Sequence, residues 1–351
     1  MMKRVWYLCM ALLVIGLCSS CKDDLPGLGK EANRFFMDDD LILTYSGEPM
    51  VGKQVHFLTY DGKRATITLD GLLDSNTLFP SEDLHDMAFG APGVVPGEVP
   101  TTLSNVPLTL NAEGTAYTFE GTDNQNNRQL TYKGEVSKDK MTLAIQVKMP
   151  ANKFVGTWNV ASENAISMTW ESEKKINVGG QELPTSAVGA MASALLSPMV
   201  AEALQSVTFM EDGNIVASYK KKGASDWQTS PINLAHYYIK DNKIYVQLHI
   251  TQILSTRASI SDMVSMLVDM QMYLMEGIPM TYSLTADAVQ IGLATDEAKA
   301  ILSLLTSDFL RDKVIGILPE DISPVVKPIL EQMPDVLKET TKLEIQLSLK
   351  K

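Results

Sequence analysis

Cysteine and positive charge are scarce in this 351-residue sequence. It contains three cysteines, and its 42 aspartates and glutamates outnumber its 30 lysines and arginines, which gives a net charge of −12. This balance argues against a surface that neutralises nucleic-acid phosphates, so we expect no nucleic-acid partner. With 22 glycines, 16 prolines and 45% hydrophobic residues, the chain is neither collagen-like nor disordered. Its length suits two globular domains, or three.

Motifs of the common enzyme classes are also absent. The sequence has no Gly-x-Ser-x-Gly elbow, no His-Glu-x-x-His pair, no P-loop and no dinucleotide-binding glycine pattern. Of the four histidines, His236 and His249 lie on predicted consecutive strands and could meet across a hairpin. The carboxylate pair of a glycoside hydrolase need not be close in sequence, so an unrecognised hydrolase stays as an alternative. We predict a non-enzymatic protein that uses no cofactor.

One acidic segment, Glu82-Asp83-Leu84-His85-Asp86, gathers three carboxylates and an imidazole. Neither helical nor strand spacing brings these groups together around one ion. We therefore predict a solvated loop here and no metal site, with a site for calcium or another cation as the alternative.

The first 20 residues have the pattern of a secretory signal peptide. A basic start at Lys3 and Arg4 precedes an apolar run over residues 5–17 and small residues at 18–20. The apolar run is too short to cross a hydrocarbon core of about 30 Å. We expect residues 1–20 to direct export and to be removed.

The end of this segment, Leu17-Cys18-Ser19-Ser20-Cys21, resembles a bacterial lipobox. The resemblance implies that Cys21 carries lipid and becomes the mature N-terminus, which ties the protein to a membrane. An ordinary secreted protein with one free thiol is the alternative. Because the other two cysteines precede Cys21, the mature chain has no disulfide and no cysteine-based zinc site.

The residues after Cys21 are Lys22, Asp23 and Asp24, and they resemble the surface-export signal of Bacteroidota lipoproteins. The resemblance implies a place on the outer surface of the outer membrane, with the periplasmic leaflet as the alternative. Residues 21–36 contain glycine, proline and several charges without a strand pattern, so we interpret them as a lipidated tether.

Residues 37–150 are predicted to form a first domain of short strands. Asp61-Gly62 between the runs 54–60 and 65–69 is a strong hairpin signal. Strict alternation over residues 142–148 puts Leu143 and Val147 on one face. Short antiparallel strands with frequent turns are typical of a sandwich or a barrel.

Five segments of this region resemble, in order, the calycin-like β-barrel domain of Bacteroidota lipoproteins. They are residues 43–47, 65–69, 106–110, 117–121 and 134–149. The resemblance implies a barrel of about eight strands and brings no known active site.

Residues 154–351 are predicted to form a second domain. Its start, Gly156-Thr157-Trp158, resembles the Gly-x-Trp that opens the first strand of lipocalin-like barrels, where the indole closes the bottom of the barrel. Predicted hairpins over 206–219 and 237–250 follow in the same order as in such barrels. The fold class that we predict is mainly β, α+β overall: two antiparallel β-barrel domains, the second with apolar helical insertions.

The helical insertions are unusually apolar. No charge occurs from Leu183 to Ala201, and we predict a buried or lid helix over 187–204, with a membrane span as the alternative. Further helices are predicted over 259–276 and 296–317, after which prolines should divide the chain into short helical pieces. The last segment, 343–349, alternates strictly and is predicted to close the barrel.

The helix predicted over 259–276 carries a methionine-rich face that suits an adaptable apolar ligand. We predict a pocket for an apolar or amphipathic small molecule, such as a lipid, lined by Met263, Met266, Leu267, Met270, Tyr273 and Trp158. Core packing is the alternative role for these residues.

Three functions therefore stay open for this predicted surface lipoprotein. The first is binding of the apolar molecule in the lidded second barrel, and the second is a structural or interaction module for an outer-membrane protein partner. The third is glycan binding through Trp170 or Trp227. An open apolar cavity would favour the first, and a packed interior would favour the second.

Overall fold

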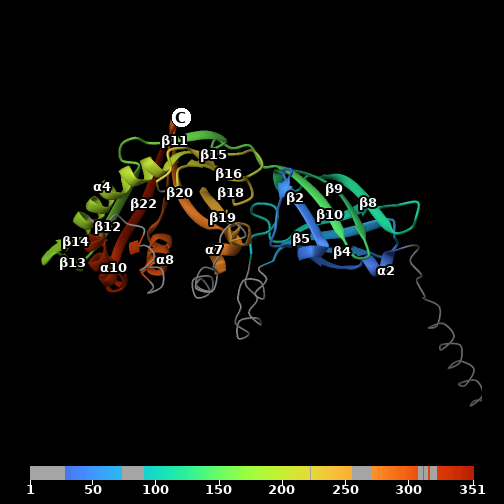
Figure 1. Ribbon diagram of the computed structural model, residues 1–351, viewed down its shortest axis with the longest axis horizontal. Helices are drawn as coiled ribbons and strands as arrows, with labels where there is room; N and C mark the ends of the chain where they lie inside the picture. The colour runs from blue at the N-terminus through green and yellow to red at the C-terminus, as the bar shows by residue number, and fades with distance from the viewer. Residues whose placement is uncertain are drawn as a thin grey trace, which may run out of the picture.

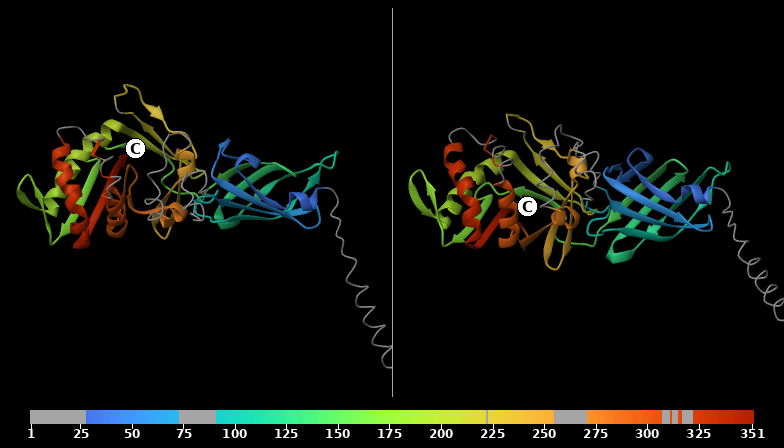
Figure 2. Two further views of the ribbon diagram at one scale, coloured as in Figure 1. Left: turned by 60° about the horizontal axis from the view of Figure 1, so that its bottom comes forward. Right: turned by 90° about the horizontal axis from the view of Figure 1, so that it is seen from below.

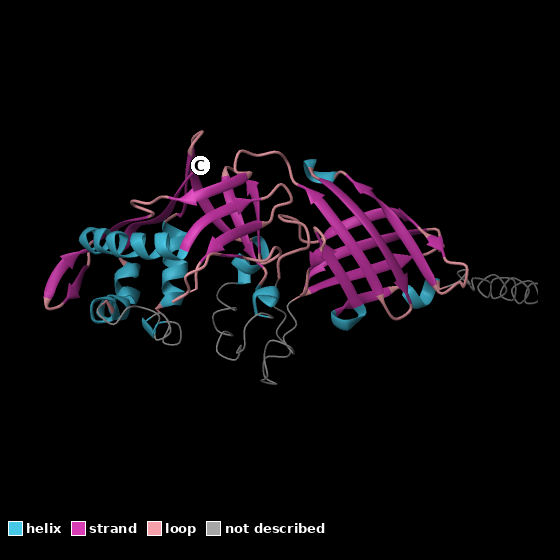
Figure 3. Ribbon diagram, turned by 45° about the horizontal axis from the view of Figure 1, so that its top comes forward, coloured by secondary structure: helices cyan, strands magenta, loops and turns pink. Residues whose placement is uncertain are grey.

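The N-terminal strands form two sheets whose strands cross face to face (Figure 3). The computed structural model describes residues 28–72, 91–221, 223–254, 271–306, 311, 315–316 and 322–351. The sheet orders are β1-β4-β5-β6 and β3-β2-β10-β9-β8-β7, and all neighbours are antiparallel except β2 and β10. The strands are β1 Arg34–Met37, β2 Leu41–Tyr45, β3 Glu48–Pro49, β4 Lys53–Thr59, β5 Arg64–Gly71, β6 Thr101–Pro107, β7 Thr109–Leu110, β8 Ala116–Asp123, β9 Gln129–Ser137 and β10 Met141–Lys148. A short helix, α2 (Gly29–Ala32), precedes them.

Period-two alternation builds the core between these sheets. On β10, Leu143, Ile145 and Val147 are buried while the residues between them are exposed. Phe119 on β8 lies opposite Gly134 on β9, and a Cβ at Gly134 would come within 2.5 Å of the Phe119 ring. The glycine therefore leaves room for a ring that fills the core.

The C-terminal strands form one strongly curved sheet beside the first domain (Figure 1). Its order is β17-β16-β15-β11-β22-β21-β20-β19-β18, and β12 also pairs with β22. The bounds are β11 Gly156–Val160, β12 Ile166–Ser172, β15 Leu204–Phe209, β16 Ile215–Tyr219, β17 Gln228–Thr229, β18 Ala235–Lys240, β19 Lys243–Leu248, β20 Ile278–Leu284, β21 Ala288–Leu293 and β22 Thr340–Lys350. A separate hairpin joins β13 (Lys175–Val178) to β14 (Gln181–Pro184).

The described residues contain no closed barrel, although the prediction of a mainly β fold with antiparallel sheets and helices is confirmed. In the curved sheet, a single bridge between Asn214 and His236 links β18 to the turn before β16, without a continuous ladder. In the N-terminal domain, the edge strands β3 and β7 have two residues each and pair only within their own sheet. A ring of hydrogen bonds is therefore not completed in either domain.

Helix α4 (Thr185–Ala203) follows the predicted range but is not buried. It is long and apolar enough to cross a membrane, yet only 11% of its most apolar stretch is buried, and it lies along β12 (Figure 1). The hydroxyl groups of Ser193 and Ser197 accept the backbone N–H groups of Met168 and Ile166, at 2.8 and 3.0 Å. Residues four apart lie on one face of a helix, and alternate residues of a strand present their N–H groups to the same edge. The two serines therefore bind the edge of β12, which the helix covers.

The remaining helices are α5 (Ile250–Leu254), α7 (Gln271–Glu276), α8 (Thr295–Leu305) and α10 (Ser323–Lys338). Two of them, α8 and α10, lie at the end of the curved sheet that also carries α4, whereas α7 lies beside β19 and β20 and α5 contacts the N-terminal domain (Figure 1 and Figure 2). The prediction that prolines divide the last stretch is wrong, because α10 is one helix containing Pro328 and Pro334. Four of its side chains are buried against the sheet, Leu330, Met333, Val336 and Leu337. Each contributes about 1.5–3 kcal/mol on burial, which offsets a cost of about 3 kcal/mol per proline.

Candidate functional site

Most of the residues that the sequence predicts for a site are not described. Residues 21–24, with the predicted lipid-acceptor cysteine and the predicted export signal, lie outside the described residues, as does the acidic segment 82–86. The same holds for four pocket residues, Met263, Met266, Leu267 and Met270. The two that are described are Tyr273, half-buried on α7, and Trp158, fully buried on β11.

The interior of the curved sheet is filled by side chains around Trp158. The indole N–H donates to the carbonyl of Phe154 at 2.7 Å. The other buried members of this core are Phe209, Tyr237, Ile244, Val289, Ile291 and Leu349. Neither Trp158 nor Tyr273 lines any of the hollows reported below. The described interior of this domain is therefore packed around the predicted pocket residue.

The two tryptophans proposed for glycan contact differ in exposure. Trp170 is buried, and its indole N–H donates to the hydroxyl of Thr340 at 2.9 Å. Trp227 is 38% exposed, and the ammonium of Lys220 lies 4.5 Å from the centroid of one of its rings. Only Trp227 of this pair reaches solvent.

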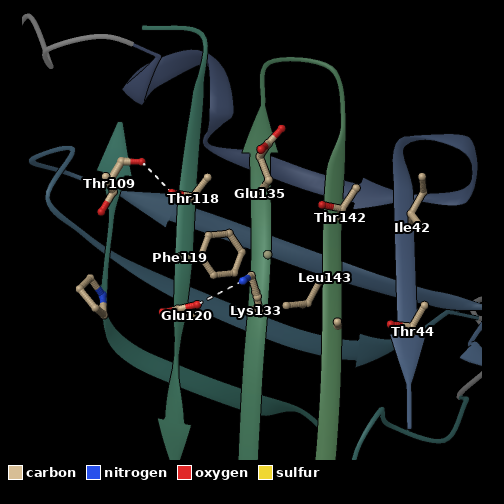
Figure 4. A pocket seen from close by; sticks show the side chains of 13 residues that line it. Ile42, Thr44, Thr109, Thr118, Phe119, Glu120, Lys133, Glu135, Thr142 and Leu143 are labelled. Carbon is tan, nitrogen blue, oxygen red and sulfur yellow. Dashed lines mark hydrogen bonds and ion pairs between the residues drawn. The ribbon is translucent and has the colours of Figure 1, made fainter. Parts of the chain in front are cut away.

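A wide hollow lies on the outer face of the six-stranded N-terminal sheet (Figure 4). It has a volume of about 700 Å³. Because side chains alternate along a strand, every second residue of β8, β9 and β10 points away from the core onto this face. The exposed side chains that line it are Ile42, Pro107, Thr109, Thr118, Glu120, Lys133, Glu135, Thr142 and Ala144.

This outer face carries hydroxyl groups and charges of both signs. Lys133 lies 3.5 Å from Glu120 on the neighbouring strand, and Glu135 is two residues further along β9 (Figure 4). The hydroxyl of Thr118 donates to the carbonyl of Thr109 at 3.3 Å. No aromatic ring is exposed among the residues that line the hollow. The face is suited to polar contacts across several strands rather than to stacking.

A second cluster of polar residues lies in the seam between the two domains. The carboxylate of Asp212 accepts the Ser46 hydroxyl at 2.5 Å, and the carbonyl of Asp212 accepts the Tyr45 hydroxyl at 2.5 Å. The side-chain amide of Asn233 donates to three carbonyls of the N-terminal domain, those of Tyr45, Glu48 and Pro49, at 3.1–3.2 Å. These contacts fix the end of β2 against the start of β16 and β18.

Three basic side chains are buried at the centre of this seam. The ammonium of Lys53, on β4, donates to the carbonyls of Pro92 and Gly93 at 2.5 and 3.1 Å and lies 3.1 Å from Nδ1 of His249. The rings of His236 and His249 meet edge to face, with centroids 4.5 Å apart. The prediction that these two histidines meet across the β18–β19 hairpin is therefore confirmed.

Burial shifts the pKa of all three groups toward their uncharged forms. Burial lowers the pKa of Lys53 to about 7, against the opposing effect of Asp70. Burial and the nearby Lys53 lower the pKa of His236 to about 3 and that of His249 well below 6.5. Buried charge is costly without a partner, so these imidazoles are uncharged near neutral pH.

A smaller hollow of about 420 Å³ opens beside the seam. Its lining comes from both domains and includes Pro96, Met149, Tyr237, Tyr238 and Lys240. Glu98 and Arg128 line it as well, and the guanidinium of Arg128 bonds to the carboxylates of Glu98 and Asp123 at 3.0 and 2.5 Å. The Arg128 side chain is only 3% exposed, so it contributes little open surface to this hollow.

Catalysis has no evident centre in the described part of the chain. There, no group of three or more His, Cys, Asp or Glu side chains is placed to hold a metal ion. The Lys53–His249 pair resembles an acid-base arrangement in distance, yet it lines neither hollow. A substrate would need a cavity that reaches these groups.

Lys53, which the N-terminal domain contributes to the seam, was not predicted from the sequence. Lys53 is a single lysine before a predicted strand, and its acceptors are 39 to 196 residues away. Nothing in the local pattern distinguishes it from a solvated lysine. Comparison of the chain with protein-family models, with curated proteins and with solved structures gives no match.

Proposed function

We propose that this chain is a non-enzymatic, lipid-anchored outer-membrane protein that binds a protein partner through the outer face of its six-stranded sheet. The observation that carries the proposal is the open hollow of about 700 Å³ on that face. The packed interior around Trp158 weakens the case for an apolar ligand there. A packed interior and an open polar surface favour an interaction module.

The chemistry of the face favours a folded or extended protein as the partner. Exposed threonine hydroxyls can donate and accept, and the Lys133–Glu120 pair presents both charges side by side. A sugar would need an aromatic platform, which the exposed lining lacks. A stable interface buries about 800 Å² on each partner, which an area of several strands can supply.

Glycan binding is the second candidate, and the exposed Trp227 is the observation that favours it. Apolar-ligand binding by the methionine-rich segment stays a proposal that rests on residues 263–270 of the sequence. The kinship with calycin-like and lipocalin-like barrels is also a proposal, supported by the strand order of the first domain and by the Gly156-Thr157-Trp158 start of β11.

The partner-binding face can be tested by photo-crosslinking from Thr118 in cells that export the protein. We expect a discrete crosslinked product whose yield falls at least about tenfold in Lys133→Glu, because the reversal places a third negative charge beside Glu120 and Glu135. The matched control is Lys140→Glu, which makes the same charge change in the exposed β9–β10 turn. Equal yields in the two variants, or no product at all, would contradict the proposal.

Membrane anchoring through Cys21 can be tested separately. We expect Cys21→Ser to abolish incorporation of radiolabelled palmitate and to release the protein from the membrane fraction, because two or three acyl chains hold a lipoprotein effectively permanently. Alanine replacement of Lys22, Asp23 and Asp24 should keep the label but reduce accessibility to protease added outside the cell. Retention of label in Cys21→Ser would show that another residue is acylated.

A further inference from the structure

The two domains are joined by one covalent passage and by polar contacts. The chain crosses once, over residues 149–155, between β10 and β11. The buried members of the N-terminal core all precede this passage, and those of the two C-terminal cores all follow it. In the described chain each of these cores therefore lies within one domain, and the contact of the Tyr45 ring with the His236 ring is where the N-terminal core meets the seam.

The hydrogen bonds at the centre of the seam assign a charged Lys53 and two neutral histidines. The ammonium of Lys53 has three acceptors for its three protons, the third being Nδ1 of His249. Nε2 of His236 lies 3.1 Å from the amide oxygen of Asn214, which makes Nε2 the protonated nitrogen. Nδ1 of His236 and Nε2 of His249 are buried without a hydrogen-bond partner.

Other charged and titratable groups around the histidines offer no compensation for a further proton. Asp70 on β5 acts on Lys53, and Asp212 bonds to the hydroxyls of Tyr45 and Ser46 instead of to an imidazole. The Tyr45 ring lies 4.8 Å from the His236 ring, and its hydroxyl points to the Asp212 carbonyl. Among the described residues, no carboxylate bonds to either histidine.

We propose that this seam is an acid-released latch between the two domains, closed while His236 and His249 are uncharged and opened when they bind protons. A proton on either ring would place a second cation beside Lys53 in a dry site. Separation of the domains hydrates both rings.

The direction of the pH dependence follows from the pKa shifts. In the closed seam, burial and Lys53 hold the pKa of His236 near 3, whereas a hydrated histidine has a pKa near 6.5. The open state therefore binds more protons between pH 6.5 and 3. The contribution of each histidine to closure is constant above that window, and within it closure falls by up to about tenfold per pH unit for each histidine. Lys53 acts in the same direction at higher pH, between about 10.5 and 7.

Small-angle scattering and hydrogen exchange of residues 22–351 between pH 7.5 and 4 test the latch. We expect the maximum dimension to increase as the pH falls through this window, with an unchanged far-ultraviolet circular dichroism spectrum. Exchange protection, corrected for intrinsic rates, should fall at residues 45–53 and 233–249 while strands β9, β10, β21 and β22 stay protected. A constant dimension down to pH 4, or uniform loss of protection, would overturn the proposal.

The variant His236→Gln with His249→Asn removes both titrations and keeps one hydrogen-bonding atom of each ring. We expect its opening to move at least one pH unit lower. The matched control is His56→Gln, on the outer side of β4, which should open as the parent does. Opening of the double variant at the parent's pH would assign the response to other groups and overturn the proposal. If the double variant is already open at neutral pH, the proposal is judged by the pH dependence of exchange protection in the parent protein alone.

Discussion

Replacement of Trp158 by alanine is expected to lower the free energy of unfolding of the C-terminal domain by about 3–5 kcal/mol. The side chain is fully buried among the aromatic and aliphatic residues inside the curved sheet. Alanine would leave a cavity there and would also remove the indole donor from the carbonyl of Phe154. Urea denaturation followed by tryptophan fluorescence measures the effect, because the tryptophans at 158, 170 and 227 all lie in this domain.

The matched control is Trp227→Ala, which removes an equally large side chain from a partly exposed position. We expect it to change the free energy of unfolding by less than about 1 kcal/mol. Similar small effects of both substitutions would mean that the space around Trp158 is already open. That outcome would favour binding of an apolar ligand inside the second domain over a packed interaction module. The two substitutions therefore distinguish between these two functions.

Local pattern was sufficient to predict most strands of both domains. The alternation of Leu143, Ile145 and Val147 and the hairpin at Asp61-Gly62 depend on neighbouring residues, and β10, β4 and β5 follow them closely. The closure of each sheet into a barrel was predicted only from the resemblance to calycin-like and lipocalin-like domains. Whether strands at two ends of a sheet meet depends on curvature and on edge length, as the two-residue strands β3 and β7 illustrate. Neither quantity is contained in a short sequence window.

The helices show where local rules are outweighed by packing. Pro328 and Pro334 should end a helix, and they do not end α10 because its buried face packs on the sheet. Similarly, the uncharged stretch of α4 was predicted to be buried or to form a lid. Its serines bond to the edge of β12 instead, and much of its apolar surface stays near solvent.

The candidate sites were predictable only in part for a related reason. His236 and His249 belong to one hairpin, so their meeting follows from strand order. Lys53 reaches them from another domain, and the carbonyls that hold it come from a segment whose path depends on the whole fold. The hollow on the outer sheet face arises from the residues that alternate with the core, yet periodicity alone does not distinguish a binding face from a solvated one.

Replacement of Arg128 by methionine is expected to lower the free energy of unfolding of the N-terminal domain by about 3–5 kcal/mol. Burial lowers the pKa of this guanidinium, but bonds to Glu98 and Asp123 raise it above its usual range. Methionine fills a similar volume and leaves both carboxylates without their cation in a largely buried site. Since the described N-terminal domain has no tryptophan, exchange protection of β8, β9 and β10 in urea measures its stability.

An exposed ion pair of the same sheet provides the control for Arg128. Lys133 and Glu120 are both more than 70% exposed at their side chains, so Lys133→Met should cost less than about 1 kcal/mol. Addition of Glu98→Gln to Arg128→Met should recover part of the loss, because it removes one uncompensated charge. If Arg128→Met instead proved as mild as Lys133→Met, water would reach the carboxylates in the native state. The hollow beside the domain seam, which Glu98 and Arg128 line, would then offer a hydrated, charged floor to a ligand.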